Sequence, residues 1–546
     1  MRTLGSRWLS AAVVSAVASL AWAAPASAAT TYCVPSTGPQ CSGTAEPDIQ
    51  SAINAAGGDS IKDTIKIAPG TYHGPFSDNN GNPIDLIGSG LATVLDSSGS
   101  DTTLAASEPT SSFSSFAVLP GNTGGTGISG FGTYTRVGVG ESQASMSVTG
   151  AVLAGRFDQG FVALYDGSST GVTLSGGTIS RSSVTAGHMG LNVLAGGTAV
   201  DDLIRATASN TFGINVGGGF TASTLTAHQD TVIGPGASIT GTALAVSASP
   251  PIAGIGGGDG QATLDGVVLR NFQRDLSADG VDSTCAPTYT SCSFSAKISL
   301  AYSDFNLAGE HLGVHSSITE GAGDLHNVGP HFKNPAGGDF SLTPGSPVVD
   351  RGNPKEPFPF EPTFDLPGNP RKVDGDANGT AIVDMGALEL SLPLARFKEP
   401  RYAVVGKKAH FNGSASHDPA SRSITGFAWR FGDGAKGTGA KPTHAYKSPG
   451  TYQVRLVVTN SVGANSLPAV QRLRVFKSRP CIVPNVRGKS LAAAGKALTA
   501  GHCKQGKVTR ARSSTVTSGH VISSKPPAGH LGSPGTKVNL VVSRGP

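Results

Sequence analysis

The chain has 546 residues and combines much glycine and proline with few charges. Its 75 Gly and 35 Pro make up about a fifth of the residues, while charged residues contribute 14% and aromatic residues 6%. This composition argues against a helical bundle and for many short strands joined by tight turns, and the length requires several domains. The 38% hydrophobic content argues against disorder. The sequence also lacks the Gly-X-Y period of collagen.

The net charge of +5 conceals two regions of opposite sign. Residues 391–546 contain 25 Lys and Arg against 3 Asp and Glu, a balance of +22. Residues 1–390 contain the remaining 16 and 33, a balance of −17. A division this large predicts at least two regions with different partners.

The first 28 residues have the pattern of a secretory signal. Arg2 and Arg7 precede an apolar, Ala-rich stretch, and residues 26–28 form an A-x-A cleavage site. The alternative is a membrane anchor, but the stretch is short and ends in small residues. No later apolar run is long enough to span a membrane. We therefore expect a secreted, extracellular or cell-wall-associated protein without a membrane span.

The six cysteines form three local pairs, which export would allow to oxidise. The pairs are Cys33 with Cys41, Cys285 with Cys292, and Cys481 with Cys503. Zinc is the alternative, but no pair has C-x-x-C spacing and no histidines cluster beside them. We expect three disulfides.

The region after the signal begins with a short helix and a strand. Residues 48–56 place apolar side chains on one helical face, and residues 64–72 (TIKIAPGTY) form a β-branched strand that Pro-Gly ends. A helix followed by this strand resembles the entrance to a right-handed parallel β-helix of the pectate-lyase type. The resemblance implies a solenoid of stacked strands.

Repeats along the same region agree with a solenoid. Residues 190–193 (GLNV) return as residues 213–216 (GINV), 23 residues later, and short apolar runs close with Gly, Asn or Asp. Equivalent residues of adjacent coils stack in such folds. We therefore expect Asn192 and Asn215 to lie one above the other. An antiparallel β-sandwich is the alternative.

The end of the acidic region carries a longer signature. Residues 338–352 (GDFSLTPGSPVVDRG) lead to Asp365, to Pro370-Arg371 and to residues 384–389 (DMGALE). This string is similar to the closing segment of the bacterial choice-of-anchor Q β-helix proteins. The resemblance implies a surface or secreted protein and implies no reaction.

A candidate calcium loop lies inside that closing segment. Asp374, Asp376 and Asn378 offer oxygens at alternate positions before a glycine, as in the first half of a calcium loop. The twelfth position holds Met385 rather than Glu, so Asp384 is the substitute ligand that we consider. The alternative is a solvated Asp/Asn/Gly-rich turn. Calcium is the one cofactor that the sequence points to.

Catalysis in the solenoid has little support from the residues. Acid–base chemistry on a glycosidic bond needs two carboxylates facing one cleft, and Asp201-Asp202 is the adjacent pair in the middle coils. The N-x-D, G-H-G and R-x-K elements of polygalacturonases are missing around it. The four basic residues of the middle coils, which include Arg270, lack the context of a lyase. We expect a turn or strand-edge pair.

A second domain is expected over residues 393–476. Residues 427–434 (FAWRFGDG) end in a turn, and residues 450–460 (GTYQVRLVVTN) alternate with a strict period of two. These strings closely resemble PKD domains, which implies an Ig-like β-sandwich. Trp429 is interpreted as a core residue and Asp433 as a turn residue. The family implies a spacer or a carbohydrate-associated module.

A third domain is expected over residues 479–546. Residues 483–490 (VPNVRGKS) precede an Ala-rich helix over 491–500 that Ser490 can cap. With residues 519–529 and 537–545, the string is strongly similar to PASTA domains, a short helix packed on a small sheet. The family is linked to peptidoglycan binding. Because Cys481 and Cys503 flank the helix, we predict that they form a disulfide.

The charge of this terminal domain favours an anionic partner. Residues 477–546 contain 12 Lys and Arg and no Asp or Glu. We expect Lys504, Lys507, Arg510 and Arg512 to contact peptidoglycan or another anionic wall polymer. The signal sequence argues against nucleic acid, and a merely solvated surface is the other alternative.

The sequence thus predicts a multidomain, mainly β protein. Its parts are a signal peptide over 1–28, a parallel β-helix over 29–390, and the PKD and PASTA domains. The hypothesis is a surface binding or adhesion protein whose β-helix presents a carbohydrate- or surface-binding face. The alternative is a wall-anchored polysaccharide lyase or glycoside hydrolase.

Overall fold

The computed structural model describes residues 28–35, 42–57, 60–121, 124–141, 148–217, 221–250, 257–285, 290–355, 363–376 and 378–546. The signal sequence and Cys41 lie outside these ranges, as does the side chain of Cys285.

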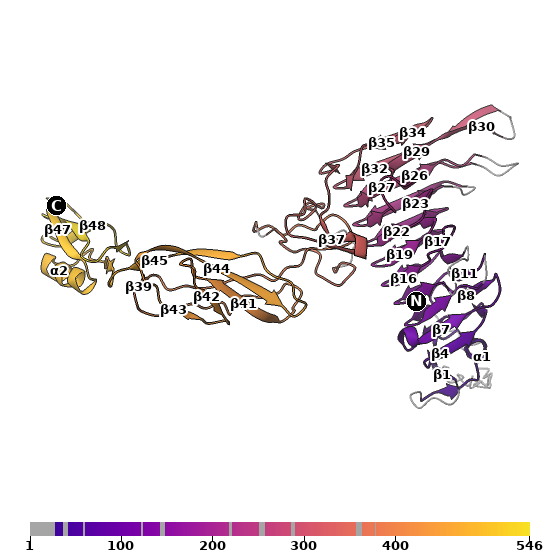
Figure 1. Cartoon of the computed structure of the whole chain (residues 1–546), viewed down its shortest axis with the longest axis horizontal. Helices are drawn as coiled ribbons and strands as arrows, with labels where there is room; N and C mark the ends of the chain where they lie inside the picture. The colour runs from indigo at the N-terminus through magenta and orange to yellow at the C-terminus, as the bar shows by residue number, and fades with distance from the viewer. Residues whose placement is uncertain are drawn as a thin grey trace, which may run out of the picture. The chain divides into compact units, whose positions relative to one another are not determined.

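The chain divides into two compact units. One consists of Met1–Thr198 with Arg205–Gly219, and the other of Ala199–Ile204 with Phe220–Pro546. The N-terminal region is built from three long parallel sheets, and each coil adds one strand to each sheet. The stacked strands are labelled in Figure 1.

The first unit has a capped helix after its first two strands. Helix α1 (Ile49–Ala55) begins after Asp48, whose side chain accepts a hydrogen bond from the Ser51 amide at 2.8 Å. Its apolar face is buried, as the spacing predicts.

The coils of this unit use three sets of parallel strands. The first set is β2 (Thr44–Ala45), β1 (Thr31–Val34), β3 (Asp63–Ile67), β6 (Ile84–Ile87), β9 (Ser112–Ser114), β12 (Thr133–Thr135), β15 (Arg156–Asp158) and β18 (Gly177–Ser180). The second is β4 (Gly70–His73), β7 (Thr93–Asp96), β10 (Ala117–Leu119), β13 (Gly138–Gly140), β16 (Phe161–Ala163) and β19 (Ser183–Ala186). The third is β5 (Phe76–Asp78), β8 (Thr102–Ala106), β11 (Thr126–Gly130), β14 (Thr149–Leu153), β17 (Thr170–Leu174), β20 (Met189–Val193) and β23 (Thr211–Val216).

Equivalent side chains of successive coils stack in this unit. Inside it, Phe113 stacks on Tyr134 with ring centroids 4.8 Å apart, and both rings are fully buried. On the third set of strands, Asn192 is registered with Asn215, and their side chains are hydrogen-bonded. The predicted stacking of these two residues is confirmed, and the antiparallel alternative is wrong for this region.

The second unit contains further coils of the same kind. The first sheet continues with β24 (Ser223–His228), β27 (Gly260–Asp265), β32 (Ala296–Ala301) and β35 (Ser316–Thr319). The second continues with β25 (Thr231–Ile233), β28 (Val268–Arg270), β33 (Asp304–Phe305) and β36 (Leu325–His326). The third continues with β26 (Gly241–Ser247), β29 (Arg274–Asp279) and β34 (His311–Leu312). The unit boundary falls within β21 (Gly196–Val200) and β22 (Leu203–Ala206). Two hairpins, β30 (Val281–Cys285) with β31 (Thr290–Phe294) and β37 (Phe332–Asn334) with β38 (Asp339–Leu342), are antiparallel. Two 3₁₀ turns are η1 (Gly90–Ala92) and η2 (Pro335–Gly337).

The register of the first hairpin differs from what a directly facing cysteine pair would require. Cys292 is registered with Ser283 rather than with Cys285, and its sulfur lies 3.5 Å from the Ser283 carbonyl oxygen. The reason is the turn, which places Cys285 opposite Thr290, so that Cys292 lies two positions further along β31. Cys292 is nevertheless part of a disulfide. Its predicted oxidation is confirmed, and its pairing with Cys285 stays a prediction.

The disulfide partner of Cys33 also stays a prediction. Cys33 lies on β1, is buried and is part of a disulfide. Because Cys41 is outside the described residues, the bond between Cys33 and Cys41 stays a prediction, whereas the oxidised state of Cys33 is confirmed.

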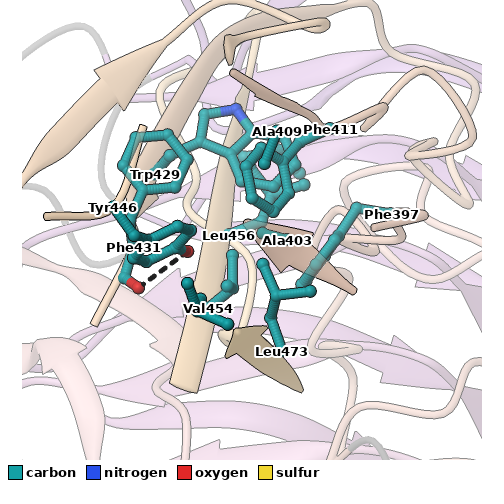
Figure 2. Close-up of a cluster of buried hydrophobic side chains, with 12 residues drawn as sticks. Phe397, Ala403, Ala409, Phe411, Trp429, Phe431, Tyr446, Val454, Leu456 and Leu473 are labelled. Atoms are coloured by element: carbon teal, nitrogen blue, oxygen red, sulfur yellow. Dashed lines mark hydrogen bonds between the residues drawn. The ribbon is translucent and has the colours of Figure 1, made fainter. Parts of the chain in front are cut away.

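A β-sandwich follows the coils. Its larger sheet has the order β39 (Ala403–Val404), β45 (Ala469–Phe476), β44 (Gly450–Asn460), β41 (Ile424–Arg430) and β42 (Lys436–Thr438); β40 (Ala409–His410) pairs with β43 (Thr443–His444). Trp429 is 1% exposed, lies in the aromatic core of Figure 2, and donates its indole N–H to the Gly439 carbonyl. Its predicted core role is confirmed.

The C-terminal module is a small α+β unit. Helix α2 (Leu491–Ala500) begins after Ser490, whose hydroxyl accepts from the Ala493 amide at 3.3 Å, as predicted. The helix packs against a sheet with the strand order β47 (Lys504–Ala511), β50 (Lys537–Ser543) and β48 (Val521–Lys525). A second, two-stranded sheet pairs β46 (Cys481–Ile482) with β49 (Leu531–Gly532). The predicted fold class is confirmed. No helix among the described residues has the length and apolar character that crossing a membrane requires.

Candidate functional site

A basic concavity of about 760 Å³ lies on the C-terminal module. Its lining residues are Ser478, Arg479, Thr499, His502, Cys503, Lys504, Gln505, Pro534 and Gly535. They come from the segment before β46, the end of α2, the start of β47 and the turn before β50. The lining includes two permanent cations and a histidine, and it includes no carboxylate. This arrangement suits an anionic ligand.

The four predicted wall-binding residues follow one exposed strand. Lys504, Lys507 and Arg510 lie on β47, and Arg512 lies just beyond its end; all four are exposed. Strand β47 is at the edge of its sheet, since its one neighbour is β50. Cations on an edge strand also prevent pairing with other chains, so this position alone does not identify a ligand.

Only Lys504 of the four lines the concavity. The sequence reasoning missed Arg479 and His502, which come from different segments and meet only in the fold. The spacing of residues along β47 gives no indication that either residue lies beside Lys504.

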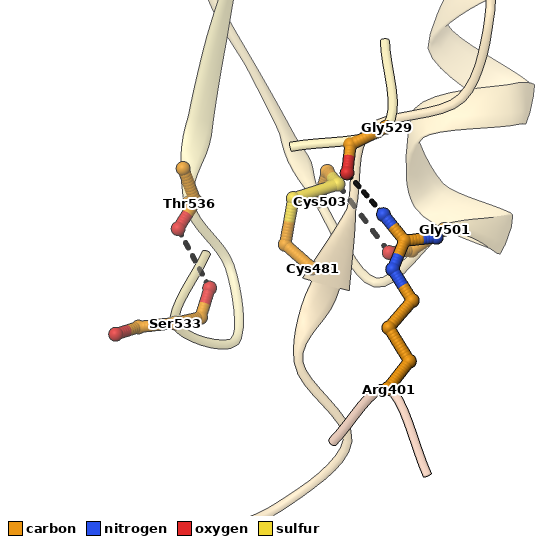
Figure 3. Close-up of a disulfide and its surroundings, with 7 residues drawn as sticks. All are labelled: Arg401, Cys481, Gly501, Cys503, Gly529, Ser533 and Thr536. Atoms are coloured by element: carbon orange, nitrogen blue, oxygen red, sulfur yellow. Dashed lines mark hydrogen bonds between the residues drawn. A yellow bond between two sulfur atoms is a disulfide. The ribbon is translucent and has the colours of Figure 1, made fainter. Parts of the chain in front are cut away.

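A disulfide fixes one wall of the concavity. Cys481 and Cys503 are joined in the structure, as Figure 3 shows, and both are buried. The bond ties the first strand of the module to the residue just after α2, on either side of the helix, as the sequence analysis expected. It therefore positions His502 and Lys504, the two neighbours of Cys503 in the chain.

An acidic group lies in the closing segment. Carboxylate oxygens of Asp350, Asp374 and Asp376 all lie within 4.8 Å of one another. Burial raises the pKa of Asp350, and the charges of Asp376 and Asp374 raise it further. Such crowding is relieved when a cation binds, and oxygen ligands are those that Ca²⁺ prefers.

The other two predicted calcium ligands are placed differently. Asp384 is fully buried outside this group, and its two oxygens accept from the amides of Asp350 and Leu390 at 2.7 and 2.6 Å. Asn378 donates its side-chain amide to Asp376 at 2.9 Å. The sequence reasoning missed Asp350, which lies 24 positions before Asp374 and has no local motif.

Asp201 and Asp202 belong to a buried network. Arg371 of the closing segment lies 3.2 Å from Asp201 and 3.4 Å from Glu389, and all three are at least 95% buried. The Asp202 side chain accepts from the Val200 amide at 3.0 Å. These carboxylates are therefore structural, which agrees with the expected turn and leaves them unavailable to a substrate.

Burial perturbs the carboxyl groups of this network. It raises the pKa of Asp384 to about 7, and it raises the pKa of Glu389 well above its usual value, where the charge of Asp384 adds to the effect. Arg371 opposes both shifts, and neighbouring carboxylates keep its own pKa high despite its burial. The closing segment also donates the Ala387 amide to the Thr231 hydroxyl at 2.9 Å. The network thus holds this segment against the coils.

A second buried cluster surrounds Arg270, which had no recognisable context in the sequence. Its guanidinium is paired with Asp304 and lies 3.7 Å from Asp275. Burial raises the pKa of Asp304 to about 7 and that of Asp275 to about 6. Arg270 also donates to the Val328 carbonyl. The cluster connects three coils and has a structural role.

Comparison with protein families identifies the two C-terminal domains. Residues 391–475 match the PKD domain family, and residues 482–544 match the PASTA domain family. Both predicted recognitions are confirmed, while the choice-of-anchor Q resemblance has no counterpart in these matches. PKD and PASTA domains, together with a disulfide, are typical of extracellular proteins.

Curated relatives share short stretches with the chain. It is 33% identical over 123 residues to collagenase ColA of Clostridium perfringens, which is 21% of this chain and 11% of that protein. It is 46% identical over 59 residues to a microbial collagenase of Vibrio alginolyticus, which is 11% of this chain and 7% of that protein. The chain thus spans about a tenth or less of the length of these relatives.

Solved structures also match short stretches. A structure of carbohydrate-binding modules from the β-sandwich superfamily is 34% identical, covering 18% of this chain and 39% of that chain, with a TM-score of 0.15. The PKD1 domain of the Vibrio cholerae metalloprotease PrtV is 30% identical, covering 15% of this chain and 96% of that chain, with a TM-score of 0.14.

Proposed function

We propose that this protein is a secreted cell-surface binding protein attached through its PASTA domain to an anionic wall polymer, with peptidoglycan as the first candidate. The observation that carries this proposal is the concavity of about 760 Å³ with Arg479, His502 and Lys504 in its wall. Residues 477–546 contain 12 Lys and Arg and no Asp or Glu, so no acidic side chain in the domain neutralises that charge. Wall glycopeptides carry the carboxylates that such a surface attracts.

The β-helix is the part that we assign to the outside partner. Its residues belong to the acidic part of the chain, with a balance of −17 over 1–390, so the anionic wall repels it and favours an outward position. We propose that it presents a carbohydrate- or surface-binding face of the choice-of-anchor Q type. The signal-like residues 1–28 supply the route out of the cell.

Catalysis by the β-helix is the weaker proposal. A glycoside hydrolase needs accessible carboxylates that converge on a cleft, and the adjacent pair Asp201-Asp202 is buried with Arg371 nearby. A lyase needs a catalytic Arg or Lys, and Arg270 is buried and paired with Asp304. A panel of polysaccharide substrates is the direct test, and release of reducing ends or unsaturated products would favour the enzyme.

We also propose that calcium binds the closing segment through Asp350, Asp374 and Asp376. The support is the convergence of their oxygens and the raised pKa of Asp350. Calcium there would join the chain just after β38 to the 374–376 loop and so stabilise the segment.

Wall attachment is tested by sedimenting the full chain with purified Gram-positive cell walls. We expect binding at low salt and release in 1 M salt, because the screening length falls from about 8 Å at physiological salt to about 3 Å at 1 M. The test variant reverses the strand charges: Lys504→Glu, Lys507→Glu, Arg510→Glu and Arg512→Glu. The matched control reverses four exposed cations of the PKD domain: Lys407→Glu, Lys408→Glu, Lys441→Glu and Lys447→Glu.

The two variants have equal net charge, so a difference between them reports the surface of the PASTA domain. We expect the first to stay in the supernatant and the second to sediment. If both variants lose sedimentation equally, the contact depends only on the net charge of the chain. If the unmodified chain stays in the supernatant at low salt, wall binding is contradicted.

A further inference from the structure

The outer face of the larger PKD sheet is strongly cationic. Along β44 and β45 the residues alternate between the core and solvent, so Leu456 is buried while Arg455 is exposed. The cations on the exposed face are Arg430, Lys436, Arg455, Arg472 and Arg474. The other exposed residues of this face in the same strands include no carboxylate and no aromatic ring.

Three of these cations form a row across adjacent strands. Arg430 is registered with Arg455 on one side and with Lys436 on the other. Strands in a sheet are about 4.8 Å apart, and like charges directly opposite each other destabilise the pair. None of the three takes part in an ion pair among the residues that the structure describes. No ion pair with a described residue therefore compensates the repulsion within the row.

The row borders a concavity of about 740 Å³. Its lining residues are Arg430, Gly432, Gly434, Ala435, Thr451, Gln453 and Arg455. Gln453 accepts a hydrogen bond from Arg455 at 3.3 Å, so the guanidinium of Arg455 is directed along β44 toward Gln453. Thr451 and Gln453 add a hydroxyl and an amide, so the wall offers partners for hydroxyl groups as well as for anions.

Glycine is required where the turn after β41 closes the concavity. Gly432 has φ of +87°, and a Cβ there would lie 2.7 Å from the Gln453 carbonyl oxygen. The next residue, Asp433, is not among the lining residues and accepts from His444 at 2.7 Å. Partial burial opposes its ionisation, but the hydrogen bonds from His444 and the Ala435 amide outweigh this and lower the pKa of Asp433. The one carboxylate of the turn is thus already engaged.

We propose that this groove of the PKD domain binds a polysaccharide with repeating carboxylate groups. A guanidinium matches a carboxylate with two parallel hydrogen bonds, so Arg430 and Arg455 bind carboxylates of the chain and Lys436 extends the contact across a third strand. Gln453 and Thr451 contact sugar hydroxyls. Single-stranded nucleic acid would need aromatic stacking partners, which the exposed face of these strands lacks. This site is separate from the PASTA surface and does not depend on wall attachment.

The test uses the full chain with the strand charges of the PASTA domain neutralised (Lys504→Gln, Lys507→Gln, Arg510→Gln, Arg512→Gln). In this background, the loss of binding caused by changing Arg430 and Arg455 reports the PKD groove, because the remaining PASTA residues, including Arg479, are the same with and without that change. The probe is sodium polygalacturonate at low salt, with neutral dextran and inorganic polyphosphate as comparisons. Adding Arg430→Gln and Arg455→Gln should weaken polygalacturonate binding about tenfold or more, because charge-assisted hydrogen bonds are lost.

The matched control removes two exposed charges away from the groove, Lys407→Gln and Lys408→Gln, and should change the affinity less than twofold. Equal losses of polygalacturonate affinity in the two variants would mean that binding depends only on net charge, which would overturn the proposal. Binding of dextran as tight as that of polygalacturonate would overturn the need for carboxylates. Tighter binding of polyphosphate would assign the groove to a phosphate polymer instead.

A second variant keeps both arginines and so guards against a folding defect. Thr451→Glu places a carboxylate in the groove and should abolish polygalacturonate binding. Its control is Ser461→Glu, which adds the same charge just beyond the other end of β44, about 30 Å along the strand. Undiminished binding by the Thr451 variant would contradict the proposed site.

Discussion

Asn215 donates its side-chain amide to the side-chain oxygen of Asn192 across 2.9 Å, from one coil of the β-helix to the next. The two residues are in register on β20 and β23, and both are half-buried. Their contact shows that the 23-residue spacing of the two sequence repeats equals one turn of the solenoid at this position. The side-chain bond runs parallel to the ladder of backbone bonds.

The Asn pair gives a direct test of the coil register. Asn215→Ala should lower the free energy of unfolding of the first unit by about 1 kcal/mol, because Asn192 then loses its partner. The double variant Asn192→Ala/Asn215→Ala should recover part of that loss, since no polar group is left unpaired. Chemical denaturation of these two variants and of Asn192→Ala measures the coupling, and strictly additive losses would show that the bond contributes nothing.

Local patterns predicted much of the fold. The apolar spacing at Ile49, Ala52 and Ile53 predicted α1, and Ser490 predicted the start of α2. These features depend on neighbours within one turn of chain, so the sequence displays them. The interior aromatic pair Phe113 and Tyr134 needed the register of the coils, which local periodicity does not specify.

The sites were harder to predict, because their members are far apart in the chain. Asp374 and Asp376 were found from their spacing, but Asp350 joins them from another segment. Likewise Arg430 and Arg455 become neighbours only through the pairing of β41 with β44. The sequence shows alternation within each strand, and only the fold shows which residues are opposite.

The buried carboxyl groups predict stability that falls between mildly acidic and neutral pH. Burial raises the pKa of Asp384 and Asp304 to about 7 and that of Asp275 to about 6. A carboxyl whose pKa is raised in the folded state stabilises fully below its unfolded pKa, near 4, and this contribution is lost as the pH rises through 6 to 7. We expect a higher Tm of the β-helix at pH 5 than at pH 8.

Differential scanning calorimetry measures that difference, and Asp384→Asn is the control. The amide does not titrate, so the variant should show a smaller change in Tm between pH 5 and pH 8. Its Tm at pH 5 should fall, because the amide has one acceptor oxygen for the two backbone N–H donors. A Tm that is higher at pH 8 than at pH 5 in the unmodified chain would contradict this account.

Calcium should raise the Tm of the second unit. If Asp350, Asp374 and Asp376 bind the ion, the gain is about 2.7 kcal/mol when calcium is at 100 times its dissociation constant. Asp376→Asn should remove most of the gain, whereas Asp101→Asn, an exposed aspartate of the first unit, should preserve it. A melting curve that millimolar calcium leaves unchanged would identify the loop as an ordinary turn.

The disulfide of the PASTA domain should contribute about 3 kcal/mol by restricting the unfolded chain, given a separation of 22 residues. The variant Cys481→Ala/Cys503→Ala should lower the unfolding transition of this domain and leave that of the β-helix unchanged. Non-reducing peptide mapping of the secreted protein provides the chemical check, and two free thiols there would contradict the bond. The same map identifies the partners of Cys33 and Cys292.

The cationic row of the PKD domain predicts a conflict between binding and stability. Arg430 lies opposite both Arg455 and Lys436, so its charge is repelled from both sides. Arg430→Gln should therefore raise the free energy of unfolding of this domain by about 0.2–1 kcal/mol at low salt. The gain should shrink in 1 M salt, where exposed charges are screened. Arg422→Gln is the control, because this arginine lies before β41, outside the cationic row, and donates to the Asn369 side chain; its loss should stabilise nothing. An Arg430 variant that is less stable at low salt would mean that the row is held by contacts within the protein rather than kept for a ligand.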